Sequence, residues 1–135
     1  MDWHDSHVHG LFIVRGQDGT GSLILDIDYI LEWDLPKGEK VYRHLIAPAT
    51  LTFVSMYDLK LHLDYRSCGT SPFSIDGIER QANLNPYGHS TYAWRIPVNF
   101  PSGEISFVAS GFKQALRAAP IWNGICLDPE QRVPF

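Results

Sequence analysis

The chain has 135 residues, of which 44% are hydrophobic and 19% are charged, and its formal net charge is −4. This length and composition predict a single globular domain over residues 1–135 and exclude an intrinsically disordered chain. The acidic balance argues against nucleic-acid binding, and no apolar run reaches the roughly 20 residues that span a bilayer. Cys68 and Cys126 lack metal-ligand spacing, and no secretory pattern precedes them, so we expect free thiols in a reducing cytoplasm.

The sequence predicts a β-hairpin near its N-terminus. Residues 7–15 and 22–33 are typical of strands, and Asp18-Gly19 between them favours a type I′ turn, because both central residues of that turn need a positive φ. The turn sets the expected cross-strand pairs, which are Phe12 with Leu25, His9 with Asp28 and Asp5 with Glu32. One face is then almost entirely apolar and is predicted to face the core: Val8, Phe12, Val14, Leu23, Leu25, Ile27, Tyr29, Leu31 and Trp33.

Strand patterns continue through the middle of the chain. Residues 41–53 are strand-like, although Pro48 indicates an edge position or a break because proline cannot donate a ladder hydrogen bond. Residues 59–65 alternate strictly, which places their leucines inward and their polar side chains outward. Residues 73–80 fit either a strand or a short helical turn. Loops rich in small or turn-forming residues are expected at 66–72 and 81–88.

A second hairpin is predicted between residues 92 and 109. A turn at Ser102-Gly103 places Val98 opposite Phe107 and Phe100 opposite Ile105. Pro97 indicates an edge strand, and exposed edges near Pro48 and Pro97 would allow a homodimer. The shared apolar face of this hairpin consists of Tyr92, Trp94, Ile96, Val98, Phe100, Ile105, Phe107 and Ala109.

Two helical segments are expected near the C-terminus. Residues 112–119 combine good helix formers and stop at Pro120, and Asp128-Pro129-Glu130 is typical of the start of a short terminal helix. Together with the strand patterns, these segments predict a mainly β fold. We expect an antiparallel β-sandwich or a strongly curved sheet of hairpins, with one short C-terminal helix.

Five stretches of the chain carry a resemblance to known proteins, namely residues 3–6, 25–33, 47–51, 58–60 and 102–112. They resemble a family of small bacterial proteins without an assigned function, and the likeness extends over most of the chain. In size and strand pattern the chain is also similar to bacterial immunity proteins, which neutralise a toxin partner. The resemblance implies a compact β-rich domain, and no catalytic activity is carried over from it.

The strongest candidate for chemistry is a quartet of His7, His9, Asp26 and Asp28. Residues two apart on a strand point to the same side, so the predicted register brings both histidines beside both aspartates. Such ligands suit zinc, manganese or iron, and a bound metal would activate water for hydrolysis. The quartet is also explained, more simply, as an ordinary cross-strand pairing on a solvated face, where aspartates discourage edge-to-edge aggregation.

Tryptophans near the ends of the predicted elements indicate a contact surface. Trp3, Trp33 and Trp122 are candidates for an exposed patch, and exposed tryptophan is enriched at protein interfaces. The leading hypothesis is a non-catalytic cytoplasmic domain, without a cofactor, that binds a basic protein partner as an immunity protein or adaptor would. The alternatives are a metal-binding protein or metal-dependent hydrolase, and a small-ligand binder with its pocket between the sheet and the C-terminal helix.

Overall fold

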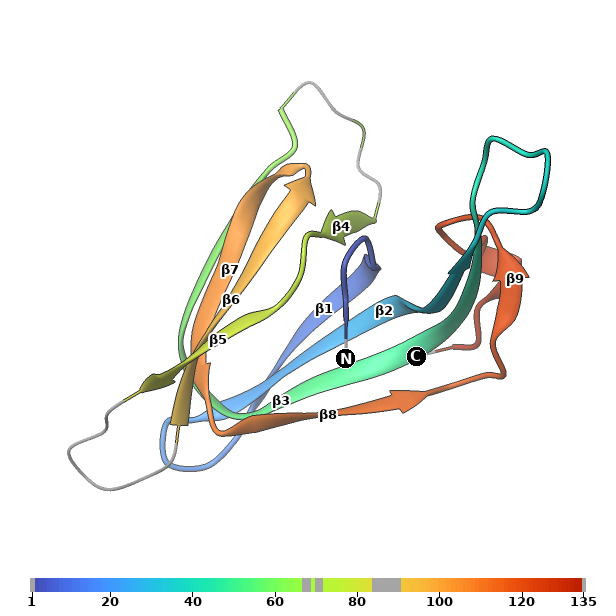
Figure 1. Ribbon diagram of the computed structural model, residues 1–135. Coiled ribbons are helices and arrows are strands. Elements are labelled where there is room, and N and C mark those ends of the chain that lie inside the picture. The colour runs from blue at the N-terminus through green and yellow to red at the C-terminus, as the bar shows by residue number, and fades with distance from the viewer. Residues whose placement is uncertain (1, 67–68, 70–71, 84–90, 135) are drawn as a thin grey trace.

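The computed structural model describes residues 2–66, 69, 72–83 and 91–134. In these residues, nine strands form one antiparallel, strongly curved sheet, which confirms the expected β-rich fold (Figure 1). No helix in this part of the chain has the length and apolar character that a membrane span needs. The elements are β1 (His7–Arg15), β2 (Gly21–Asp34), β3 (Arg43–Asp64), β4 (Phe73–Ile75), β5 (Glu79–Asn83), β6 (Thr91–Phe100), β7 (Ser102–Ala109), β8 (Gly111–Leu116), β9 (Ile121–Asn123) and the 3₁₀ helix η1 (Pro129–Gln131).

The strand pairings close into a ring. Neighbouring strands follow the order β2, β1, β4, β6, β7 and β3, and β3 pairs again with β2. Strand β3 makes this possible because its 22 residues pair first with β2 and then with β7. Between the two parts, Ser55 and Asp58 each have a φ of 53°, and β3 changes its partner there. Figure 1 shows two diverging arms, with β2, β3 and β8 in one and β5, β6 and β7 in the other.

The first hairpin has the turn that the sequence predicts. Asp18 and Gly19 have φ values of 57° and 77°, as a type I′ turn requires. Thr20, however, faces two residues across the hairpin, because its amide donates to the Gln17 carbonyl and its carbonyl accepts from the Gly16 amide. This arrangement is a β-bulge directly beside the turn.

The bulge makes the predicted register wrong by one residue. Leu25 pairs with Leu11 instead of Phe12, and after a second bulge between Val8 and Gly10, Asp28 pairs with His7 instead of His9. Asp5 lies before β1 and bonds through its amide to the Ile75 carbonyl, so it has no pairing with Glu32. The expected core face is therefore divided: Val8, Leu23, Leu25 and Ile27 are buried, whereas Phe12, Val14, Leu31 and Trp33 are exposed.

The second hairpin turns at a different place from the one predicted. Val98 pairs with Gly103, and only Pro101 separates β6 from β7, so the chain turns around Pro101 instead of at Ser102-Gly103. The register moves by an even number of residues, so Ile96, Ile105 and the rest of the described apolar face still point into the core. Gly103 is required within β7, because a Cβ there would lie 2.1 Å from the His62 carbonyl oxygen of β3.

Pro97 does not lie on an edge strand, which corrects that expectation, whereas Pro48 lies at a break in the pairing on one side of β3, one of the two alternatives expected for it. Among the described residues, β3 and β6 each have neighbours on both sides. Pro48 lies between the residues of β3 that pair with β8 and β9, and Pro97 between those of β6 that pair with β5 and β4. Each proline thus lies where one neighbour is interrupted, so its missing amide removes no ladder bond. These positions give no support to an edge-to-edge dimer.

Residues 112–119 contain a strand and not the predicted helix. Strand β8 pairs with Ala49–Val54 of β3, and this pairing satisfies backbone groups of β3 that would otherwise be buried without partners. Long-range pairing therefore outweighs the local helix propensity. The prediction of a short terminal helix is confirmed, since η1 begins at Pro129 with Asp128 as its N-cap.

Between the hairpins the structure describes two short strands, whereas residues 76–78 and the described residues of the first expected loop, Arg66, Gly69 and Pro72, lie outside any strand. Residues 73–75 form β4 and Glu79–Asn83 form β5, so the start of the loop expected at 81–88 belongs to a strand. The remaining parts of the two expected loops, residues 67, 68, 70, 71 and 84–88, lie outside the described residues.

Phe53 lies at the centre of the core between the two arms. It is fully buried, and its ring centroid lies 5.1 Å from that of Trp94 and 4.7 Å from that of Phe107. We predict that Phe53→Ala lowers the free energy of unfolding by about 3–5 kcal/mol, because it leaves a cavity. Ile13→Ala, at a side chain that is 59% exposed, should cost less than about 1 kcal/mol. Urea denaturation measures both, and equal costs would contradict this placement of the core.

Candidate functional site

The outer face of β2 carries two aspartates that the sequence places in solvent. Asp26 and Asp28 alternate with the fully buried Leu25 and Ile27, so they point away from the core. Nevertheless, the side chain of Asp28 is 0% exposed and that of Asp26 is 14% exposed. The C-terminal segment, residues 117–134, covers this face, and the expectation of a solvated acidic surface is wrong.

Two arginines from the C-terminal segment neutralise the two aspartates. Arg117 lies with its Nη2 2.5 Å from Oδ1 of Asp26, and its Nη1 donates to the Thr50 hydroxyl over 3.0 Å. Arg132 contacts Oδ1 of Asp26 and Oδ1 of Asp28, and its side chain is only 10% exposed. We call Asp26, Asp28, Arg117 and Arg132 the buried charge network. Its two negative and two positive charges balance, as charges removed from water must.

An apolar contact holds the C-terminal segment beside this network. Leu127 is buried against Ile30 of β2 and Ile46 of β3, and its amide donates to Oδ2 of Asp28 over 2.9 Å. One carboxylate therefore fixes the backbone of the segment as well as the side chain of Arg132. Apolar burial and charge pairing act on the same short stretch of chain.

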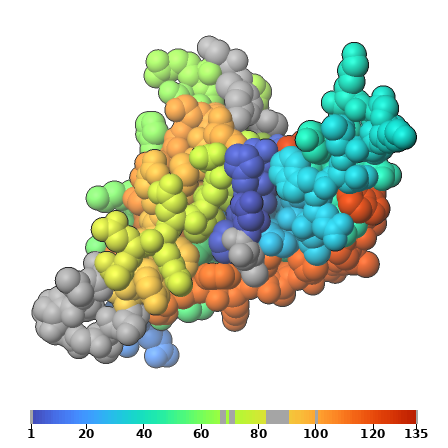
Figure 2. Space-filling view, in the orientation of Figure 1, coloured from blue at the N-terminus to red at the C-terminus, as the bar shows by residue number. Residues whose placement is uncertain are grey.

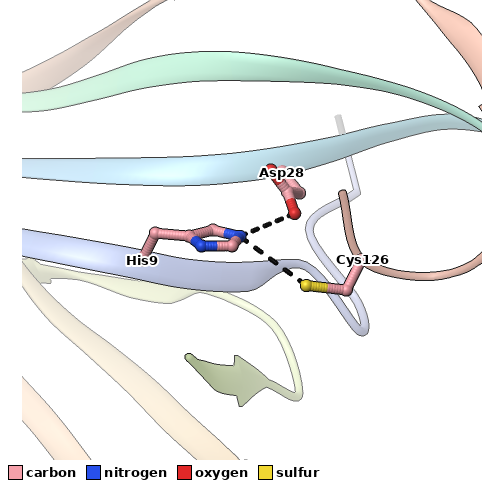
Figure 3. A group of neighbouring side chains, drawn as sticks. All are labelled: His9, Asp28 and Cys126. Carbon is pink, nitrogen blue, oxygen red and sulfur yellow. Dashed lines mark hydrogen bonds and ion pairs between the residues drawn. The ribbon is translucent and has the colours of Figure 1, made fainter. Parts of the chain in front are cut away.

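His9 and Cys126 complete a second group around the same carboxylate (Figure 3). His9 is the extra residue of the bulge in β1, and its Nε2 lies 2.7 Å from Oδ2 of Asp28. The Sγ of Cys126 lies 3.7 Å from the same nitrogen. We call His9, Asp28 and Cys126 the His9 cluster. Its three donor atoms lie within 4.8 Å of one another.

The protonation states in the His9 cluster follow from burial. Loss of solvent and the neighbouring Arg132 guanidinium lower the pKa of His9 to about 4, so the ring is neutral at neutral pH. A neutral ring that close to a carboxylate carries its proton on Nε2 and donates it to Asp28. Burial raises the pKa of the Cys126 thiol, which favours the protonated form over the reactive thiolate.

The predicted quartet is only partly brought together. The contact between His9 and Asp28 is present, but Asp26 is held by the arginines, and His7 lies outside the His9 cluster. The sequence-based reading missed Cys126, Arg117 and Arg132. One signal for a covered face was available, because Ile24 and Ile30 lie on the same side of β2 as the two aspartates.

The three tryptophans differ in exposure. Trp3 is 7% exposed and donates its indole N–H to Gln114 Oε1 over 2.8 Å, so the expectation that it lies in a surface patch is wrong. It is buried because the N-terminal segment folds back over the core. Trp33 and Trp122 are 44% and 43% exposed, as expected. They lie on opposite faces of the sheet, since His44 pairs with Trp33 and the next residue of β3 pairs with Trp122.

The His9 cluster does not have the geometry of a catalytic relay. In cysteine hydrolases, one imidazole nitrogen faces the thiol and the other faces the orienting acid. In this structure Nε2 of His9 is the atom close to both Cys126 and Asp28 (Figure 3). Comparisons with protein-family models, curated proteins and solved structures find no match to this chain. Its function is therefore inferred from its own side chains.

We predict that Arg132→Met lowers the free energy of unfolding by about 3–5 kcal/mol, because it leaves the Asp28 carboxylate buried and short of a counter-charge. The matched control is Arg43→Met, since Arg43 pairs with Asp34 at a site where both side chains are about half exposed. That change should cost less than about 1 kcal/mol. Thermal or urea denaturation distinguishes the two variants. Similar losses of unfolding free energy would show that the buried charge network contributes no more to stability than an exposed ion pair.

His9 should titrate far below an ordinary histidine. Because its pKa falls from 6.5 to about 4 on folding, the unfolded chain takes up a proton first as the pH is lowered. The contribution of His9 to stability is thus complete above pH 6.5 and declines by at most about 3 kcal/mol towards pH 4. NMR titration of the ring measures the pKa directly. A midpoint near 6.5 would contradict the buried neutral state, and His9→Gln should flatten the stability profile over this range.

Proposed function

We propose that the protein is a non-catalytic protein-binding domain and that it binds through the end of the β2–β3 hairpin, residues 31–43. The observation that carries this proposal is a group of large apolar side chains exposed on one projecting element. Figure 2 shows this hairpin end standing out from the body of the molecule. Exposed apolar groups gathered on a projection are typical of partner-binding sites. The exposed side chains are Leu31, Trp33, Leu35, Val41 and Tyr42.

The aromatic side chains of the hairpin end support one another. The ring of Trp33 lies edge-on to that of Tyr42 at 6.3 Å and to that of His44 at 4.4 Å between centroids. His44 is buried, so it anchors the exposed Trp33 on the sheet. Rings held in this way lose little conformational entropy on binding, and tryptophan and tyrosine often dominate the binding energy of an interface.

The opposite face of the hairpin end carries a second aromatic site. The Arg43 guanidinium lies 5.2 Å from the ring centroid of Trp122, which β9 presents beside β3. A partner that encloses the projection would therefore contact aromatic rings on both faces. Residues 31–43 contain three acidic and three basic side chains, so the contact is selected by apolar shape, and the net charge of −4 favours approach of a basic partner. Immunity proteins and adaptors act through binding of this kind.

Two alternative functions have less support. Catalysis by the His9 cluster is disfavoured, because Nε2 of His9 is close to both Cys126 and Asp28, so the ring cannot relay a proton between them, and because burial favours the protonated Cys126 thiol over the thiolate. A small-ligand pocket between the sheet and the C-terminal segment would need space where Ile30, Ile46 and Leu127 already pack together. The exposed hairpin end needs neither chemistry nor a cavity, so binding is the function that its geometry supports best.

We predict that a photo-reactive phenylalanine analogue at position 42 cross-links one partner protein in cells, because Tyr42 is 50% exposed on the hairpin end. The same analogue at Lys113, an exposed position of β8, is the matched control and should not capture that partner. With the partner purified, Trp33→Ala should weaken the Kd by about 10-fold or more, as expected of an aromatic anchor.

Two results would overturn the proposal. Equal cross-linking at positions 42 and 113 would remove the hairpin end as the site. An unchanged Kd for Trp33→Ala with the purified partner would remove the aromatic anchor. Circular dichroism of Trp33→Ala should match the wild-type spectrum, because Trp33 lies outside the core cluster of buried residues.

A further inference from the structure

Three donor atoms of different chemical types meet beside the bulge in β1. Nε2 of His9 lies 2.7 Å from Oδ2 of Asp28 and 3.7 Å from Sγ of Cys126. Zinc bonds to nitrogen and oxygen at about 2.0–2.2 Å and to sulfur at about 2.3 Å, so tetrahedral ligand atoms lie about 3.4–3.6 Å apart. The nitrogen–sulfur separation is within about 0.3 Å of this spacing, and Nε2 of His9 and Oδ2 of Asp28 would move apart by about 0.7 Å to admit the ion. We propose that His9, Asp28 and Cys126 bind a Zn²⁺ ion.

Both Oδ2 of Asp28 and Sγ of Cys126 approach the same nitrogen, Nε2 of His9, and this arrangement supports an ion shared by the three residues. The bulge redirects His9 out of the regular alternation of β1, and bulges often re-aim functional side chains in this way. Asp28 comes from β2 and Cys126 from the C-terminal segment, so three separate parts of the chain supply the ligands (Figure 3). Imidazole, carboxylate and thiolate are the ligands that zinc takes in proteins.

Outer contacts hold the Asp28 carboxylate in place for this role. Arg132 contacts Oδ1, which leaves Oδ2 turned towards His9, and the Leu127 amide donates to Oδ2 over 2.9 Å. Hydrogen-bonded partners of this kind orient the ligands of metal sites and raise their affinity. The charges of Arg117 and Arg132 are balanced by Asp26 and Asp28, so an entering cation does not meet a net positive site. Binding would release the thiol proton of Cys126 to solvent, and the proton of the neutral His9 ring would move from Nε2 to Nδ1 to free the ligating nitrogen.

Two of the three ligand residues are partly exposed, since the side chain of His9 is 16% exposed and Cys126 is only partly buried. His9 borders an open depression of about 410 Å³, lined also by Leu11 of β1 and Leu63 of β3. Three protein ligands leave a fourth position, which a water molecule would fill. This inference does not depend on the hairpin end, so the metal site and the proposed binding function can fail separately.

Cobalt titration of the purified full chain tests the site, because Co²⁺ occupies zinc sites and reports thiolate ligation by a near-ultraviolet charge-transfer band. We expect 1:1 binding, a charge-transfer band, and displacement of Co²⁺ by Zn²⁺. Cys126→Ser should abolish the band, and the matched control Cys68→Ser should retain it. His9→Gln should weaken Zn²⁺ binding by about 10–100-fold or more.

Alkylation of the wild-type protein gives a second test that needs no variant. Zn²⁺ should slow iodoacetamide modification of Cys126 while leaving that of Cys68 unchanged, as measured by mass spectrometry of the peptides. Binding of Zn²⁺ weaker than about 1 mM, a band that survives in Cys126→Ser, or equal alkylation of Cys126 with and without Zn²⁺ would each overturn the proposal.

Discussion

The carboxylate of Asp28 imposes the constraint on which this structure depends. A fully buried charge must be paired, and here its partners come from the far end of the chain, as the Arg132 guanidinium and the Leu127 amide. Pairing Asp28 therefore positions the C-terminal segment on the outer face of β2 and β3. The position of Cys126 beside His9 follows from that placement, while the pairing of β9 with β3 holds Trp122 beside Arg43.

The buried charge network is not an efficient way to stabilise a protein. An apolar surface of the same shape would often be as stable or more so, but a charged pair left unmatched costs several kcal/mol. Any alternative path of the C-terminal segment would leave Asp26 and Asp28 unpaired beneath it. The network thus favours a single position of the segment, while Leu127 against Ile30 and Ile46 adds apolar burial at that position.

The features that depend on neighbouring residues could be predicted from the sequence, and those that depend on distant parts of the chain could not. The Asp18-Gly19 turn and the start of η1 depend on neighbouring residues, and both predictions are confirmed. The register failed because one bulge beside that turn shifts all later pairs, and the helix over 112–119 failed because β3 supplies a strand partner. The contact of His9 with Asp28 was predicted, but from the wrong register. Arg117, Cys126 and Arg132 could not be predicted, because their approach depends on the path of a segment about 90 or more residues away.

Native-state hydrogen exchange at the Leu127 amide tests the central claim most directly, because this amide donates to the buried Asp28 carboxylate. If the network fixes the C-terminal segment on the sheet, the Leu127 amide should exchange as slowly as the Leu25 amide of β2. Protection on the order of 10⁴-fold or more is expected, as for groups that open only on global unfolding. Fast exchange at Leu127 while Leu25 stays protected would show that the segment detaches on its own and would contradict this account.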